Sequence, residues 1–284
     1  MPHKGNPSVK NFKAWASNQF IILKYFVRLL VLLLLPNLLI FTIRMITVCF
    51  DFGNTRLKYA VFYAHELQFV KVLDDAEPDT IARLLQQVQP QKSILSSVIN
   101  HNTEIESILS EFSRFHLLSN LTRLPFTAPV TKPETIGADR LALSAGAVSF
   151  FPGKHNLVIG LGTCITYNFI SKYNQFLGGG ISPGMEMRLK SLRDYTAKLP
   201  LVKADWNFPL VGYDTKTNIT SGVILGMAKE IDGIIDAYSE RYSNFNVLLT
   251  GGDSPYFAQV LKNKIFADPH LIYKGLYAIS EYNN

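Results

Sequence analysis

Cysteine is scarce in this 284-residue chain, which contains two, Cys49 and Cys164. Two cysteines exclude a fold held together by several disulfides and a zinc site built from cysteine ligands. The six histidines form no i, i+4 pair and no cluster flanked by carboxylates, so a transition-metal site is not expected. Both cysteines lie in apolar, strand-like text, which suits a reducing cytoplasm.

Two common nucleotide-binding signatures are missing as well. No G-x-x-x-x-G-K-[ST] loop is present, and the run from Gly160 has Ile165 where the Rossmann fingerprint needs its third glycine. A nucleophile-elbow pattern, G-x-S-x-G, does occur at residues 180–184. Pro183 follows its serine and has no N–H for an oxyanion hole, so we interpret this segment as the wall of a substrate pocket.

Acidic residues are absent from residues 1–44, which hold six of the 28 basic residues. This leader therefore accounts for the whole formal charge of +6, and the remaining chain has 22 basic and 22 acidic residues. A formally neutral body lacks the positive surface that nucleic-acid binding requires, so no nucleic-acid partner is expected.

The leader contains an apolar run over residues 20–43 that is long enough to cross a bilayer if it is helical. Lys24 and Arg28 interrupt this run, Pro36 would kink a helix, and no small-residue cleavage site follows. We therefore expect that an upstream start was chosen and that Met45 begins the protein. A membrane anchor on a cytoplasmic enzyme is the alternative, and mass spectrometry of the N-terminus distinguishes the two.

From residue 45 onward the hydrophobic pattern alternates between strand and helix periods, as expected of an α/β protein. Three strands are followed by a helix, a strand and a second helix; the expected ranges are 46–51, 57–63, 67–73, 79–89, 92–98 and 103–112. A similar series restarts at Asn156, with strands at 156–161, 165–171, 175–179 and 246–250. The pattern predicts a duplicated β-β-β-α-β-α unit.

The duplication predicts one domain over residues 45–153 and a second over residues 154–284, with a helix at 138–151 carrying the chain between them. Two such units placed back to back form a cleft, and each contributes a strand-turn-strand whose backbone N–H groups face it. A cleft of this kind suits a polyphosphate.

The turn that follows the first strand reads Asp51-Phe52-Gly53-Asn54-Thr55. In a phosphoryl transferase, Asp51 would hold Mg²⁺, the backbone and Thr55 would bond phosphate oxygens, and Lys58 would neutralise charge. An ordinary tight turn uses the same residue types, so this turn alone does not distinguish a phosphate-binding loop from a simple hairpin turn. The segment 160–163 repeats this turn in the second copy, where Gly160 takes the position that corresponds to Asp51. Residues 250–253 end a strand and open a helix, which is a suitable place for the adenosine of a nucleotide.

Three loops of this kind on a duplicated chain resemble the superfamily of acetate kinase, sugar kinases, Hsp70 and actin. Residues 137–140 (GADR), 178–184 (GGGISPG), 212–215 (GYDT) and 271–276 (LIYKGL) resemble type III pantothenate kinase, over essentially residues 45–284. The resemblance implies two ribonuclease H-like domains of the actin-like ATPase superfamily. It also implies a cytoplasmic homodimer that uses ATP and Mg²⁺ to phosphorylate pantothenate to 4'-phosphopantothenate, the first step of coenzyme A biosynthesis.

The resemblance also assigns roles. It makes Asp139 the general base, although an Asp in the first turn of a helix is also common for capping alone. The implied substrate-binding residues are Gly137, Ala138, Asp139, Arg140, Thr215 and, in place of an aromatic residue, Val130. The implied ATP- and phosphate-binding residues are Asp51, Phe52, Gly53, Asn54, Thr55, Arg56, Leu57, Lys58 and Thr163, with Asp51 as the Mg²⁺ ligand.

Two family carboxylates are missing from this chain. Gly160 stands where an acid commonly ligates potassium or ammonium, and Asn168 replaces another acid. Losing a hard oxygen ligand argues against dependence on a monovalent cation. Two alternatives follow: another kinase or phosphohydrolase of the superfamily, or a non-catalytic regulator. Asp139 favours chemistry, since a regulator has no need of it.

Overall fold

The computed structural model describes residues 45–283, of which Ile46 onward form one compact unit. The predictions made for the leader fall outside the described residues. Within the described part of the chain, no helix combines the length and the apolar character needed to cross a membrane.

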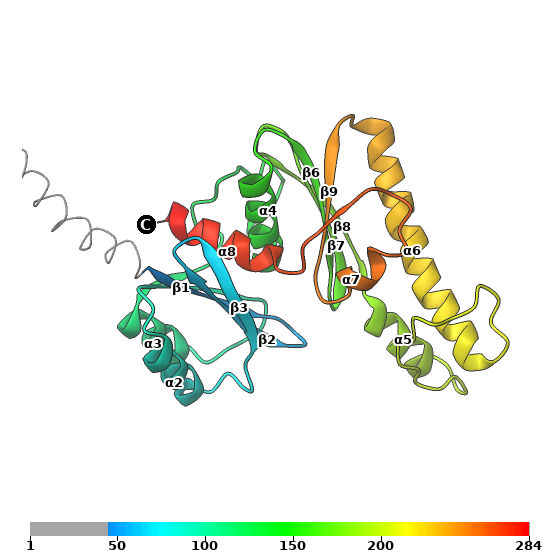
Figure 1. The fold of residues 1–284 in the computed structure, drawn as a ribbon, viewed down its shortest axis with the longest axis horizontal. Helices are drawn as coiled ribbons and strands as arrows, with labels where there is room; N and C mark the ends of the chain where they lie inside the picture. Colours follow the sequence, from blue (N-terminus) through cyan, green and yellow to red (C-terminus); the bar gives the residue numbers. More distant parts are fainter. Residues whose placement is uncertain (1–44, 284) are drawn as a thin grey trace, which may run out of the picture. The chain divides into compact units, whose positions relative to one another are not determined.

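The first half of the unit is built on a five-stranded sheet (Figure 1). Its strands are β1 (Ile46–Phe52), β2 (Leu57–Tyr63), β3 (Glu66–Val72), β4 (Lys92–Ser97) and β5 (Arg114–Leu117), in the order β3-β2-β1-β4-β5. β1 pairs antiparallel with β2 and parallel with β4. Helices α2 (Pro78–Val88) and α3 (Glu104–Phe112) bury Ile81, Leu85, Ile105 and Leu109 against one face.

The second half repeats this arrangement. Its strands are β6 (His155–Leu161), β7 (Cys164–Ile170), β8 (Phe176–Pro183), β9 (Phe245–Thr250) and β10 (Phe266–Ala267), in the order β10-β9-β6-β7-β8. Helices α5 (Met185–Asp194) and α6 (Thr215–Arg241) cover one face, and the short α7 (Ser254–Phe257) follows β9. The predicted duplicated fold is confirmed. The short strands β5 and β10 were not predicted, because four- and two-residue strands carry no clear periodicity.

A pair of helices, α4 (Ala138–Phe150) and α8 (Leu271–Tyr282), shares a core with residues of both sheets, including Ile94 and Val158. A 3-10 turn, Pro133–Thr135, precedes α4. A Cβ at Gly275 of α8 would lie 1.8 Å from the carbonyl oxygen of Ala142, so the two helix backbones touch. This close approach fixes the amino-terminal ends of both helices near the carboxyl ends of β1 and β4.

The alternation of side chains along β1 decides which residues face this helix pair. Val48, Phe50 and Phe52 pack with α2 and α3, whereas Cys49 packs with α4 and α8. Asp51 has the same parity as Cys49 and therefore lies on the α8 face, at the carboxyl end of the strand. The division at 153/154 remains a prediction; β1–β5 and β6–β10 lie on either side of it.

Candidate functional site

The first predicted turn lies between β1 and β2. The backbone N–H of Gly53 donates to the carbonyl of Arg56 at 3.2 Å, which closes the turn, and residues 54–56 are exposed. Phe52 is fully buried and Leu57 packs against the same core, so only the backbone of these two residues faces a ligand.

The second predicted turn, between β6 and β7, meets the first. The hydroxyls of Thr55 and Thr163 lie 2.8 Å apart, although they are separated by 108 residues in the chain. Both threonines are exposed, as are Asn54 and Gly162. Two short turns with exposed backbone and hydroxyls therefore converge, and such an arrangement suits phosphate oxygens.

Two carboxyl groups lie beside these turns. Burial raises the pKa of Asp51 to about 6; the charge of Lys58 opposes this rise and the charge of Asp139 adds to it. Burial also raises the pKa of Asp139, against hydrogen bonds from the backbone N–H groups of residues 139 and 140. Asp51 and Asp139, on different elements, are thus close enough to affect each other's ionisation, and such pairs are typical of functional sites.

The start of α4 is shaped around Asp139. Gly137 is the N-cap residue, and a Cβ there would lie 2.6 Å from Oδ1 of Asp139. Glycine is therefore required for the carboxylate to fold back over the first turn of its own helix. The hydrogen bonds from its own first turn still leave lone pairs on this half-buried carboxylate, so helix capping does not exclude a role in binding.

Arg140 lies beside Asp139 and is held by neutral oxygens. Its Nε donates to Oδ1 of Asn168 at 2.6 Å and its Nη2 donates to the carbonyl of Tyr167 at 3.3 Å. Asn168 in turn donates to the carbonyl of Val158 at 3.4 Å. With an amide instead of a carboxylate at residue 168, the guanidinium keeps positive charge for an anionic ligand.

The predicted cation position at Gly160 is filled by neighbouring side chains. A Cβ at residue 160 would lie 2.8 Å from Oγ1 of Thr166 and 3.1 Å from Cδ1 of Leu143. An acidic side chain at this position would require Thr166 and Leu143 to shift. Over residues 45–283, no group of three or more His, Cys, Asp or Glu side chains is arranged to hold a metal ion. A magnesium ion needs only one or two carboxylates plus substrate phosphates, so the predicted assignment of Asp51 to Mg²⁺ does not require such a group.

The predicted adenosine segment, residues 250–253, leads from β9 into α7. Gly251 has a φ of 97°, and a Cβ there would lie 2.2 Å from the carbonyl oxygen of Leu161. Burial raises the pKa of Asp253, Glu186 adds to the rise, and Arg56 of the first turn opposes it. Sequence analysis did not anticipate that Arg56 approaches Asp253, because no motif connects residues so far apart.

A buried tyrosine near Asp51 was also missed. Tyr273, in the first turn of α8, is 2% exposed, and its pKa is raised by burial and by the charge of Asp51. Its only sequence signal was its place in the LIYKGL segment, which does not reveal what the side chain faces.

The structure does not bring Thr215 and Val130 together with Asp139. Thr215 is the exposed first residue of α6, on the face of the second sheet opposite α4 (Figure 1). It lines a hollow of about 640 Å³ together with Arg188 and Asn218. Val130 packs on the core shared by α4 and α8. The structure therefore brings together the two predicted turns, Asp51 and Asp139, and leaves Thr215 apart from them.

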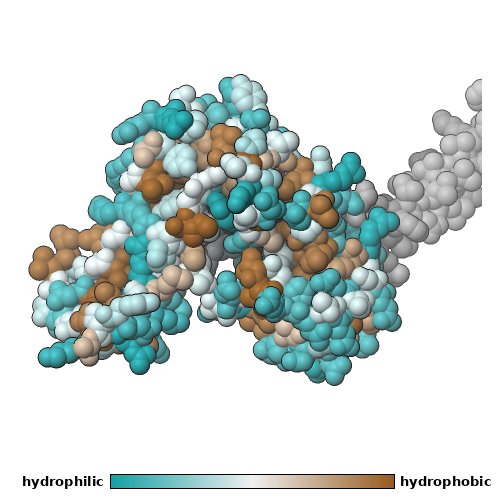
Figure 2. All heavy atoms as spheres, turned by 180° about the vertical axis from the view of Figure 1, so that it is seen from behind, coloured by the Kyte–Doolittle hydropathy of each residue, from teal (hydrophilic) through white to brown (hydrophobic). Residues whose placement is uncertain are grey.

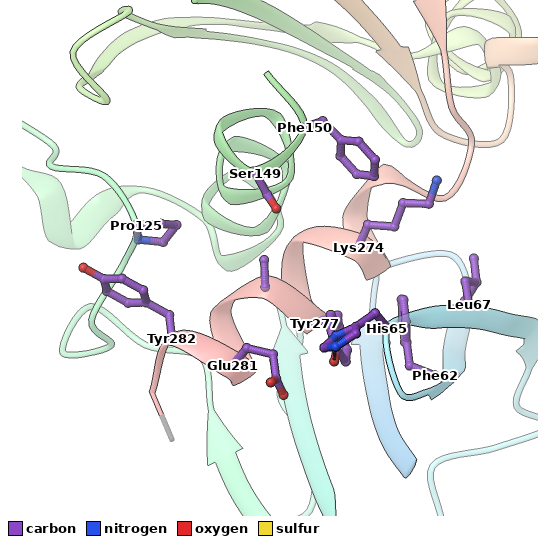
Figure 3. A pocket seen from close by; sticks show the side chains of 11 residues that line it. Phe62, His65, Leu67, Pro125, Ser149, Phe150, Lys274, Tyr277, Glu281 and Tyr282 are labelled. Atoms are coloured by element: carbon purple, nitrogen blue, oxygen red, sulfur yellow. Dashed lines mark hydrogen bonds between the residues drawn. The ribbon is translucent and has the colours of Figure 1, made fainter. Parts of the chain in front are cut away.

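Another cavity, of about 620 Å³, lies at the opposite end of β1 from Asp51 (Figure 3). Phe62 lines it and pairs with Thr47 at the start of β1, whereas Asp51 pairs with Lys58. Its ionisable side chains His65, Glu281 and Lys274 already have partners: His65 with Tyr277 at 3.0 Å, Glu281 with Lys92 at 2.8 Å, and Lys274 with Asp268 at 2.8 Å. We do not assign the nucleotide to this cavity.

Comparison with known proteins agrees with this geometry. The model of the type III pantothenate kinase family matches residues 47–237. A type III pantothenate kinase of Cytophaga hutchinsonii is 43% identical over 242 residues, which cover 83% of this chain and 99% of that protein. One from Bacteroides fragilis is 41% identical over 240 residues, covering 82% and 97%.

Solved structures agree on the fold. A Campylobacter jejuni protein described as a putative Baf family transcriptional activator has a TM-score of 0.54 and 21% identity, covering 83% of this chain and 98% of its own. A putative 2-dehydro-3-deoxygalactonokinase of Sinorhizobium meliloti has a TM-score of 0.50 and 11% identity, covering 83% and 98%. The family match and the sequence relatives show that the chain belongs to the type III pantothenate kinase family.

Proposed function

We propose that this protein transfers phosphate from ATP to pantothenate, giving 4'-phosphopantothenate for coenzyme A biosynthesis. The observation that supports this most is the convergence of the turns of Thr55 and Thr163 beside two carboxyl groups, Asp51 and Asp139. Phosphoryl transfer needs mainly positioning and charge neutralisation, and this arrangement offers both. The family match supports the choice of pantothenate.

The two turns are proposed to hold the phosphates of ATP. Asn54, Thr55 and Thr163 are exposed and offer a backbone N–H and two hydroxyls as donors, and Lys58 brings positive charge near Asp51. Asp51 would hold Mg²⁺, directly or through water, and that ion would neutralise charge on the transferred phosphate. Metal binding requires an ionised carboxylate, which the nearby lysine favours.

Asp139 is proposed as the general base for the pantothenate hydroxyl. Its carboxylate sits at the start of α4, near Asp51 and next to Arg140. A raised pKa makes a carboxylate a better proton acceptor near neutral pH. Arg140, whose hydrogen-bond acceptors are both neutral, is proposed to attract the carboxylate of pantothenate.

A homodimer is proposed to complete the substrate site. Thr215 lies on the far face of the second sheet from Asp139, so a second copy would have to supply it. Large hydrophobic side chains stand exposed in the segment before α6, namely Tyr195, Leu201, Leu210, Val211 and Tyr213. Figure 2 shows hydrophobic residues on the lobe that contains α5 and the start of α6. Such a patch is typical of a protein interface.

The two free cysteines suit the cytoplasm, where we place the enzyme.

The direct test is Asp139→Asn, assayed for pantothenate phosphorylation with ATP and Mg²⁺. We expect kcat to fall by about 10²–10⁴-fold, because this is the usual contribution of a general base. The matched control is Asp79→Asn, which removes another first-turn aspartate, an exposed one on α2. A kcat for Asp139→Asn within about tenfold of the parent value would sink the proposal. A panel of sugars and polyphosphates assayed beside pantothenate tests the alternative substrates.

A further inference from the structure

A group of four partly buried side chains joins four elements of the second half of the molecule. Glu230 of α6 accepts hydrogen bonds from Tyr167 of β7, at 3.0 Å, and from the guanidinium of Arg188 of α5. Arg188 also donates to the hydroxyl of Ser182 in β8 at 2.9 Å. The side chains of Arg188 and Glu230 are 23% and 26% exposed, so solvent screens their attraction only in part.

The network keeps Glu230 charged. Burial raises the pKa of its carboxyl, but hydrogen bonds from Arg188, Ser182 and Tyr167 more than offset this, and the pKa lies below its ordinary value. Burial and Glu230 together raise the pKa of Tyr167, so its hydroxyl remains a donor. An ion pair at this depth is weak evidence for stability, since apolar residues of the same volume often serve as well. The ion pair of Arg188 and Glu230 is therefore better considered for the backbone geometry that it holds.

Arg188 holds the segment that follows β8. Its Nε donates to the carbonyl of Pro183 at 2.8 Å, and its backbone N–H donates to the carbonyl of Gly184 at 3.0 Å. Gly184 packs directly against the second phosphate turn, which is the turn of residues 162–163 between β6 and β7. Its N–H donates to the carbonyl of Thr163 at 3.0 Å, and a Cβ would come within 2.2 Å of the carbonyl oxygen of Gly162.

We propose that Arg188 and Glu230 are positioning residues for the second phosphate turn. This inference rests on the proposed function, since it takes that turn to bind ATP. Glu230 orients the guanidinium, the guanidinium fixes residues 183–184, and Gly184 sets the position of Thr163 opposite Thr55. The planar fork of Arg allows it to bond Glu230 and Pro183 at once, which Lys cannot do. Without the pair, the turn has to be ordered when nucleotide binds, and affinity falls.

The test measures Mg·ADP binding to the full chain by calorimetry, together with steady-state kinetics. Glu230→Gln is the lead variant, because Glu230, unlike Arg188, does not line the hollow of Thr215. We expect its Kd for Mg·ADP and its KM for ATP to rise by about tenfold, or 1.4 kcal/mol. Its kcat and its KM for pantothenate should change by less than about threefold. Arg188→Lys should weaken Mg·ADP binding similarly.

The matched control is Asp236→Asn, which breaks an exposed ion pair on the same helix, with Lys262 at 2.6 Å. Its Kd should stay within about twofold of the parent, whatever happens to its thermal midpoint. Tyr167→Phe keeps the ion pair and should raise the Kd by about two- to threefold; this milder variant decides the matter if Glu230→Gln fails to fold.

The outcomes separate the two proposals. Parental Mg·ADP affinity in a folded Glu230→Gln or Tyr167→Phe protein overturns the positioning role and leaves the kinase assignment intact. Equal weakening in Asp236→Asn also overturns it, because the effect would then follow from any broken ion pair on α6. A parent protein that does not bind Mg·ADP contradicts the proposed function itself.

Discussion

The two strand-turn-strand units of this molecule occupy equivalent places in sheets of the same strand order, but their side chains differ in chemistry. In the first, Asp51 is the next-to-last residue of β1 and the turn carries Gly53 and Thr55. In the second, β6 has Gly160 at the matching position, and the turn carries Gly162 and Thr163. Both lie in sheets of the same strand order, and the two threonine hydroxyls meet.

The surroundings of the two turns differ as well. Around the second turn, Gly184 and Gly251 approach the carbonyls of Gly162 and Leu161 at distances that no Cβ permits. Around the first, a Cβ at Gly53 would meet the carbonyl of Arg56 at an ordinary 3.4 Å, while Asp51 and Lys58 supply charge. The two copies therefore share their strand order, whereas the ionisable groups are concentrated in one copy.

Between the two strand-turn-strand units, the largest expected effect is that of removing the carboxylate of Asp51 from the first. Asp51→Asn should lower kcat/KM by about 10²–10³-fold, as expected for the loss of a group that stabilises transferring charge. Adding Gly160→Asp to this variant should not restore activity, because Thr166 and Leu143 occupy the space of the new side chain. Steady-state kinetics at saturating Mg²⁺ measure both. Recovery in the double variant would contradict the proposed asymmetry.

A glycine packed against the second turn and a glycine within the first should differ in how much stability their substitution costs. Gly251→Ala should lower the free energy of unfolding by about 3 kcal/mol, since φ is 97° and the new Cβ meets the carbonyl of Leu161. Gly53→Ala should cost less than about 1 kcal/mol. Chemical denaturation measures both values. Similar losses at the two positions would show that the turns are packed alike.

The pH dependence of stability should reveal the burial of Asp51. Because its pKa is raised to about 6 in the folded protein, the folded state binds a proton more tightly than the unfolded chain. Stability should therefore fall as pH rises through 6. Asp51→Asn should be more stable than the parent by about 2 kcal/mol at pH 8, after allowance for partial solvent screening. The difference should nearly vanish at about pH 4. Denaturation at both pH values tests this, and a constant difference would contradict it.

The smallest expected effect concerns monovalent cations. Since the space beside Gly160 is filled, replacing potassium or ammonium by choline at constant ionic strength should change kcat by less than about twofold. Activation by more than about tenfold would mean that other oxygens form a cation site. Assays on Asp51→Asn cannot decide this, so the parent protein is used.

Much of the site followed from local sequence. The strand-turn pattern around Gly53, the glycine-rich partner at Gly162 and the absence of an acid at Gly160 were all readable from spacing. The approach of Arg56 to Asp253, of Tyr273 to Asp51 and of Arg188 to Glu230 was not, because each joins elements distant in the chain. Short strands such as β10 were missed since two residues have no period.

The sequence by itself determined the duplicated order of strands and helices and the residue types available at each turn, because these depend on side-chain periodicity and glycine placement. Tertiary structure decided which carboxylates come together: α8 and α4 cross with touching backbones at Gly275, and this crossing sets Asp139 near Asp51. It also decided that Thr215 lies on the other face of the second sheet, since side-chain pattern assigns a helix to a face only after the sheet order is known.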